Sequence, residues 1–292
     1  MNKPKAIVVV TGVKFAKALR RFDATQDVRY FEFSDGTYKM NSGAGAVLAL
    51  HDEYELFVHG NSEDAGKRLV ELGLIDASRY FALNLANKDD AYVLAEAVNK
   101  YKKESGLPVH LVHYGAASEA GSSLPDGSLG MSIWDTPASA VHGLIDANCV
   151  ALINLLQALK ENEVFDNQPI TKVVSLTAIA AIRARAQFTL DNIQKAAGHA
   201  LVRSLALELT PEKIYLSEIM VGSLDGGYYD NDKTLNTSVK SSAKLGYAYE
   251  PESKPVFTAE QVGDAVRYVL NARSNVREVI IAPYGQYPQL GA

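Results

Sequence analysis

Residues 171–210 read TKVVSLTAIAAIRARAQFTLDNIQKAAGHALVRSLALELT, and this stretch decides the fold. It opens with a short apolar, β-branched run at Val173 and Val174 and then passes through small residues. Apolar residues then recur at helical spacing, at Leu190, Ile193, Ala197, Leu201, Leu205 and Leu209. The pattern predicts a buried strand that feeds a long helix.

Composition and charge limit the class of protein. The 292 residues are 47% hydrophobic and 22% charged, as expected of one large soluble α/β domain. A formal net charge of -5 argues against nucleic acid or an anionic membrane as a partner, because both attract basic surfaces. The apolar runs are strand-sized and the first is too short for a signal peptide, so a cytoplasmic location is expected. The single Cys149 excludes an internal disulfide and a cysteine-based metal cluster, and no metal site is expected.

The 171–210 stretch resembles the short-chain dehydrogenase/reductase family, whose members carry a serine at the end of this strand and a Tyr-x-x-x-Lys pair on the helix. The segment KAAGHALVRSLALEL is similar to the family's helix and places the family's lysine at Lys195. At the family's spacing, Asp191 stands in place of the tyrosine and Ala178 in place of the serine. Two of the three catalytic side chains are therefore replaced.

The order of the other elements supports the same resemblance. Strands are expected at 5–12, 55–62, 79–85, 109–112, 213–221 and 279–282, and helices at 138–162, 189–209 and 257–270. The resemblance implies a single α/β domain over 1–292. This domain would contain a Rossmann-like, doubly wound parallel sheet of about seven strands, with the ligand cleft at the carboxyl ends of the strands. It also implies a variable substrate lid at 223–256, and homo-oligomers, dimers or tetramers, formed through the helices at 138–162 and 189–209.

The first strand ends in Thr11-Gly12, which in the family begins a Thr-Gly-x-x-x-Gly-x-Gly loop around a dinucleotide pyrophosphate. Here the later glycines of that loop match Gly43 and Gly45, so that 13–40 is an insert. The insert begins with a basic segment of helical character and continues, over 28–40, with β-prone arms around an Asp35-Gly36 turn. We expect a hairpin that either serves as a lid or partner arm or packs its aromatic side chains on the domain.

A second interpretation of the N-terminal region remains open. Residues 13–21 would form the first helix and 28–33 the second strand, with Asp35 as the acid that binds the ribose of a dinucleotide. The strand, helix and strand pattern over 55–85 favours the first interpretation.

The end of the second strand selects the cofactor in the resembled family. Asn61 and Ser62 stand there, with Lys67 and Arg68 one turn further on, and the lack of an acid favours NADP(H) over NAD(H). At the third strand, Asn84-Leu85 takes the place of the family's Asp-Val pair that contacts adenine.

The remaining expected site residues lie after later strands. His113-Tyr114-Gly115-Ala116 replaces the family's Asn-Asn-Ala-Gly, and Tyr114 is either a displaced proton donor or a ring that fills the space of an absent cofactor. Asn148 matches the asparagine that supports a water relay to the lysine, and Gly222 matches the glycine after the sixth strand. Strand alternation predicts that Ser175 and Thr177 point away from the face that Ala178 uses.

Three functions are compatible with these residues. The first is an NADP(H)-linked oxidoreductase on a small carbonyl or hydroxyl metabolite, with Tyr114 or Asp191 as a non-standard proton donor. The second is a catalytically inactive homologue, with or without a cofactor, that acts as a binding or assembly subunit. The third is an acid-base dehydratase or isomerase built on Asp191 and Lys195, although four-residue spacing on a helix equally predicts an ion pair between them.

Overall fold

The computed structural model describes residues 4–19, 29–115, 134, 138–166, 168–184, 188–227, 256 and 258–283. Its centre is a seven-stranded sheet in which every neighbouring pair of strands is parallel, in the order β10-β9-β8-β7-β1-β5-β6. The strands are β1 (Ile7–Val10), β5 (Glu55–Gly60), β6 (Tyr80–Ala82), β7 (Val109–Tyr114), β8 (Thr171–Ala178), β9 (Ile214–Val221) and β10 (Glu278–Ile281). The predicted doubly wound α/β sheet is therefore confirmed.

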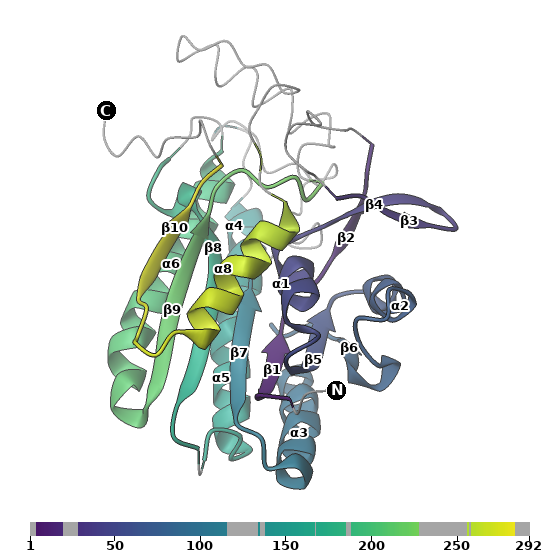
Figure 1. The fold of residues 1–292 in the computed structure, drawn as a ribbon. Coiled ribbons are helices and arrows are strands. Elements are labelled where there is room, and N and C mark those ends of the chain that lie inside the picture. Colours follow the sequence, from purple (N-terminus) through teal and green to yellow (C-terminus); the bar gives the residue numbers. More distant parts are fainter. Residues whose placement is uncertain are drawn as a thin grey trace.

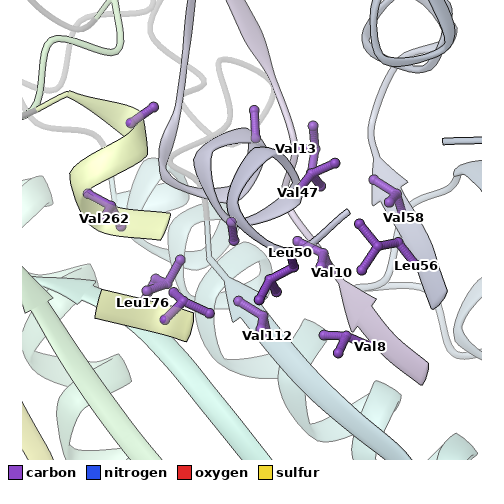
Figure 2. Packing of buried hydrophobic residues seen from close by; sticks show 14 of the residues in the cluster. Val8, Val10, Val13, Val47, Leu50, Leu56, Val58, Val112, Leu176 and Val262 are labelled. Atoms are coloured by element: carbon purple, nitrogen blue, oxygen red, sulfur yellow. The ribbon is translucent and has the colours of Figure 1, made fainter. Parts of the chain in front are cut away.

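Helices cover both faces of this sheet, which explains why its central strands are continuously apolar rather than alternating (Figure 1). One face carries α1 (Ser42–Leu50), α2 (Glu63–Glu71) and α8 (Ala259–Asn271). Figure 2 shows Val47 and Leu50 near Val10 and Val112, with Val262 on the side of Leu176. The other face carries α3 (Lys88–Ser105), α5 (Ala151–Glu161) and α6 (Thr189–Leu209).

The helix predicted at 138–162 contains an irregular turn. It consists of α4 (Ala138–Ile145), a π-helical turn (Asp146–Val150) and α5, and π turns occur frequently at functional sites. Ala138–Glu161 is long and apolar enough to cross a membrane, but Leu152, Leu155 and Leu159 are buried in the core of the domain. The segment is accounted for as a core helix of the fold.

The insert forms a second, three-stranded antiparallel sheet of order β2-β4-β3, which we call the insertion sheet. Its strands are β2 (Phe15–Lys17), β3 (Phe31–Phe33) and β4 (Gly36–Met40), and β3 and β4 form a hairpin around Asp35. The expected helical character of the basic segment is wrong where the structure describes it, because pairing with β4 makes 15–17 a strand. Residues 20–28 lie outside the described residues, as do most of the expected lid at 223–256.

The alternative interpretation of the N-terminal region is also wrong. β1 lies between β7 and β5 and pairs with both in parallel register, whereas β3 pairs only with β4 among the described strands. Asp35 therefore does not follow the second strand of the central sheet.

Candidate functional site

Because parallel strands all end at the same edge of a sheet, the expected site residues lie along one carboxyl edge. Gly12 follows β1, Asn61 follows β5, and Tyr114 ends β7. Gly222 follows β9 and Ala178 ends β8, so the edge spans most of the sheet. The structure thus brings the separate sequence positions into one region.

The two halves of the interrupted glycine loop meet in space. Gly12 has φ 73, and a Cβ there would lie 2.0 Å from the Tyr114 carbonyl oxygen, so only glycine fits. A Cβ on Gly43 would lie 3.0 Å from the Gly12 oxygen. Asn41 joins the two by donating to the Gly12 oxygen at 2.8 Å and accepting from the Ala44 N–H at 2.9 Å, which caps α1. The insertion sheet therefore leaves and re-enters the turn without separating its ends, and α1 starts at a position suited to an anion.

Gly45, also expected in the cofactor loop, faces a neighbouring helix. A Cβ on Gly45 would lie 2.0 Å from the carbonyl oxygen of Ala259 in α8, and one on Gly263 would lie 2.3 Å from the Gly45 oxygen. This glycine is therefore required for the close contact between α1 and α8.

Lys195, on α6, is buried and bonded to two elements of the expected site. Its Nζ donates to the Gly115 oxygen at 3.0 Å and to Asn148 Oδ1 at 3.3 Å. Asn148 lies in the π-helical turn, and its Nδ2 donates to the Leu144 oxygen and to Gln194 Oε1, each at 2.9 Å. Burial lowers the pKa of Lys195, and the negative charge of Asp191 opposes that shift. Asn148 thus orients the lysine directly.

Asp191 is 8% exposed and lies one turn before Lys195 on α6. Its Oδ1 accepts from Gln194 Nε2 at 3.2 Å. The ion pair that the spacing predicted stays a prediction: both side chains are buried and the negative charge of Asp191 acts on Lys195, whose Nζ donates to Gly115 and Asn148. Gln194, which links Asp191 to Asn148, was missed by sequence reasoning.

Tyr114 reaches from the end of β7 to the start of α1. Its side chain lies near Ser42, and its ring centroid lies 5.5 Å from Lys195 Nζ. Burial and the nearby Asp191 charge raise the pKa of Tyr114 to about 12.

Two buried histidines support the Gly12 turn, and sequence reasoning missed both. His59 Nδ1 accepts from the Gly12 N–H at 3.3 Å, which leaves Nε2 to donate to the Leu83 oxygen at 3.0 Å. His113 Nδ1 lies 2.9 Å from the Thr11 hydroxyl. Burial lowers their pKa values to about 4 and about 3, so both are neutral near pH 7. A histidine at the end of an otherwise apolar strand was the available signal.

Ser175 and Thr177 lie nearer to Lys195 than strand alternation suggested. Both line a small cavity of about 10 Å³ that also contacts His113, Gln194 and Lys195, with room for about one water molecule. Thr177 donates to Glu218 Oε1 at 2.6 Å, and is therefore committed to β9. Ala178 ends the strand and is partly exposed.

The residues expected near adenosine differ in exposure and in their hydrogen bonds. Asn61 and Ser62 are exposed, and Ser62 is the N-cap residue of α2. Asn84 Oδ1 accepts from the Ala86 N–H at 3.2 Å, which stabilises a local turn. The Leu85 side chain is buried in the core and its carbonyl accepts from Asn154 at 3.1 Å, so Leu85 is committed to packing. The Gly222 N–H donates to the Ile281 oxygen at 2.8 Å and extends the pairing of β9 with β10.

A family model described as enoyl-(acyl carrier protein) reductase matches residues 43–276, which is most of the chain. The chain therefore belongs to the short-chain dehydrogenase/reductase family, as the residues around Lys195 predicted. A search of curated proteins found no significant match.

Many solved structures share the fold. FabI from Candidatus Liberibacter asiaticus has a TM-score of 0.68 at 15% identity, covering 97% of this chain and 95% of its own. An alcohol dehydrogenase from the archaeon Thermococcus sibiricus, complexed with 5-hydroxy-NADP, has 0.63 at 17% identity, covering 97% and 99%. A short-chain dehydrogenase/reductase from Burkholderia phymatum, in complex with NAD, has 0.66 at 13% identity, covering 95% and 89%. The neighbours thus include proteins bound to NADP-type and NAD ligands.

Proposed function

We propose that this protein is a nicotinamide-dinucleotide-linked oxidoreductase acting on a small carbonyl or hydroxyl compound, with Tyr114 in place of the family's missing tyrosine as proton donor. The observation that carries the proposal is the position of Lys195. It is held at the carboxyl edge by Gly115 and Asn148, beside a glycine turn that the insert leaves intact. A cytoplasmic location and a homo-oligomer built on α4, α5 and α6 belong to the same proposal.

The residues present fit a dinucleotide at the start of α1. Gly12 and Gly43 let the ends of β1 and β7 meet the start of α1 closely, and the helix N-terminus favours the negative pyrophosphate. Lys195 would hold the ribose next to the nicotinamide, which supplies or accepts the hydride. The Tyr114 ring lies 5.5 Å from Lys195 Nζ and so borders the same region.

Proton transfer falls to Tyr114 because of its protonation state. A pKa of about 12 keeps the phenol protonated at neutral pH, whereas an Asp carboxyl is ordinarily ionised there and has no proton to donate. The rate of acid catalysis is highest when the donor pKa is near the working pH, so a pKa this high implies slow turnover. Ala178 has no hydroxyl with which to position a substrate oxygen, and this also predicts weak generic carbonyl reduction.

The test starts with calorimetric titration of NADH and of NADPH into the purified protein. Micromolar binding of either is expected, and it should weaken in Lys195→Met but persist in Lys100→Met, which removes an exposed lysine from α3. Failure of both dinucleotides to bind at millimolar concentration would overturn the proposal.

Activity variants then separate the possible acids. Tyr114→Phe should abolish reduction while dinucleotide binding is kept, and Asp191→Asn should leave activity measurable. Loss of activity in Asp191→Asn with Tyr114→Phe unaffected would instead make Asp191 the acid. Restoring the family residues with Ala178→Ser and Asp191→Tyr should raise activity, by up to the ~10² to 10⁴ that acid-base catalysis supplies.

A second candidate, a non-catalytic binding or assembly subunit, is favoured by one observation. The Tyr114 ring lies 5.5 Å from Lys195 Nζ, where the nicotinamide end of a dinucleotide is expected. Absence of binding in the titration would support this function. The dehydratase or isomerase hypothesis has less support, because Lys195 directs its hydrogen bonds to Gly115 and Asn148.

A further inference from the structure

The insertion sheet is fixed to the carboxyl edge by a fully buried ion pair. Lys39 Nζ in β4 lies 2.7 Å from Asp225 Oδ1 in the segment after β9, and both side chains are 1% exposed. The Tyr30 hydroxyl donates to the other Asp225 oxygen at 3.4 Å. In Figure 1 the insertion sheet lies beyond the carboxyl ends of β1 and β5, above α1 and α2. The buried ion pair therefore holds the insertion sheet next to the carboxyl edge, where the cofactor is expected.

Aromatic packing then fixes the hairpin between β3 and β4. Phe33 contacts the rings of Phe15 and Tyr38 edge to face, with centroids 5.8 and 5.7 Å away. The Tyr38 hydroxyl donates to Asp35 Oδ2 at 2.8 Å. Asp35, at the hairpin turn, is held in one orientation as a result.

That orientation directs Asp35 at Arg68 of α2. Arg68 donates to both Asp35 oxygens, at 2.9 and 2.7 Å, and to both Asp64 oxygens, at 2.9 and 3.1 Å. Its guanidinium also stacks over Tyr38 at 3.6 Å from the ring centroid. The Arg68 side chain is 7% exposed, and the paired guanidinium lowers the pKa of Asp35 well below its usual range. All three guanidinium nitrogens are thus in use.

This pairing occupies Arg68, one of the two basic residues, with the exposed Lys67, that sequence reasoning placed near the extra phosphate of NADP. Side chains on a helix lean toward its N-terminus, so Arg68 reaches the first turn of α2, where it meets Asp64. That turn follows Asn61 and Ser62, the expected ribose end of the site. Guanidinium binds carboxylate and phosphate with the same bidentate geometry, so a 2′-phosphate and Asp35 compete for one partner.

We propose that Asp35 of the insertion sheet sets cofactor preference by holding Arg68, so that the protein selects NAD(H) against NADP(H). The proposal rests on the proposed function, in that a dinucleotide must bind. NAD(H) has no 2′-phosphate and does not require Arg68 to be released. The carboxylates of Asp35 and Asp64, at the expected ribose end of the site, would also repel a 2′-phosphate. Asp35 lies outside the residues that the family model matches, whereas Asp64 lies within them.

The test measures dissociation constants for NADH and NADPH on wild-type protein and single variants. Wild type should bind NADH at least about tenfold more tightly than NADPH, the scale of one charge-assisted contact. Asp35→Asn should tighten NADPH by about tenfold while NADH changes by less than about twofold. Asp35→Glu, which keeps the carboxylate, should retain the NADH preference and controls for damage to the hairpin.

Two further variants separate release of Arg68 from loss of a charge. Asp64→Asn removes the same charge from α2 itself and should tighten NADPH by less than about threefold. The combination of Asp35→Asn with Arg68→Gln should abolish the gain. Wild-type preference for NADPH, equal gains in the two Asp variants, or a gain that survives Arg68→Gln would overturn the assignment to Asp35. Binding of neither dinucleotide by any variant would instead overturn the proposed function and this inference together.

Discussion

Replacing Lys39 by Met should destabilise the protein far more than loss of an ordinary lysine does. The change removes one partner of the Lys39 and Asp225 pair, in which both side chains are 1% exposed and the charged atoms are 2.7 Å apart. Asp225 would then lose the cation that is buried against it, and breaking a buried pair in this way costs about 3 to 5 kcal/mol. With a urea slope of about 2 to 3 kcal/mol/M, the midpoint of unfolding should fall by roughly 1 to 2 M.

An exposed ion pair of similar length provides the matched control. Lys160 Nζ lies 2.9 Å from Glu212 Oε2, but these side chains are 54% and 46% exposed. Lys160→Met makes the same chemical change in solvent and should cost about 1 kcal/mol or less. Urea titrations followed by circular dichroism should therefore separate the two variants clearly.

The double variant identifies the cause. Lys39→Met combined with Asp225→Asn removes both charges, so the buried carboxylate is gone and much of the stability should return. The coupling energy between the two positions should be about 2 kcal/mol or more. A Lys39→Met midpoint no lower than that of Lys160→Met, or additive effects of the two substitutions, would refute the reasoning.

Two more predictions concern the folded core. The pKa values of His59 and His113 are lowered to about 4 and about 3, so the unfolded chain binds more protons than the folded one below pH 6.5. The free energy of unfolding should therefore fall as the pH drops from about 6.5 toward 4. Urea midpoints that do not change over that range, or whose pH dependence changes as much on replacing exposed His142 as on replacing His59 or His113, would contradict this. Gly45→Ala should lower the free energy of unfolding by about 3 kcal/mol, because the new Cβ would lie 2.0 Å from a backbone oxygen of α8. A Cβ on Gly198 meets nothing within 4 Å, so Gly198→Ala should raise the free energy of unfolding by about 0.5 to 1 kcal/mol. Thermal unfolding that ranks the two variants in the opposite order would refute this prediction.

Much of the fold was predictable because the patterns that specify it are local. The apolar runs around Val9, Val112 and Val174 became central strands, and the spacing of Leu190 and Leu201 became α6. The Asp35-Gly36 turn likewise marked the hairpin between β3 and β4. The segment at 15–17 could not be predicted in the same way, because a three-residue strand is stabilised by its partner and not by its own composition.

The candidate site was predictable in its positions but not in its connections. The spacing placed Lys195 and Asn148 in the site, and it identified Gly12 and Gly43 as parts of one loop. It did not indicate that Gly45 packs against α8, or that Gln194 joins Asp191 to Asn148. Those contacts depend on which helix face meets which neighbour, and the sequence around each residue does not contain that information.

The sequence by itself determined the parallel sheet and the register of α6, and it predicts that Ala178 and Asp191 replace the family's serine and tyrosine. Only the tertiary structure decided what the charged groups do. Arg68 looked available to a phosphate until its guanidinium was found between Asp35 and Asp64, and nothing in the sequence indicated that Lys39 is buried with Asp225. Hydrophobic periodicity is a property of neighbouring residues, whereas ion pairs and pKa values depend on distance and burial in space, and those exist only once the chain has folded.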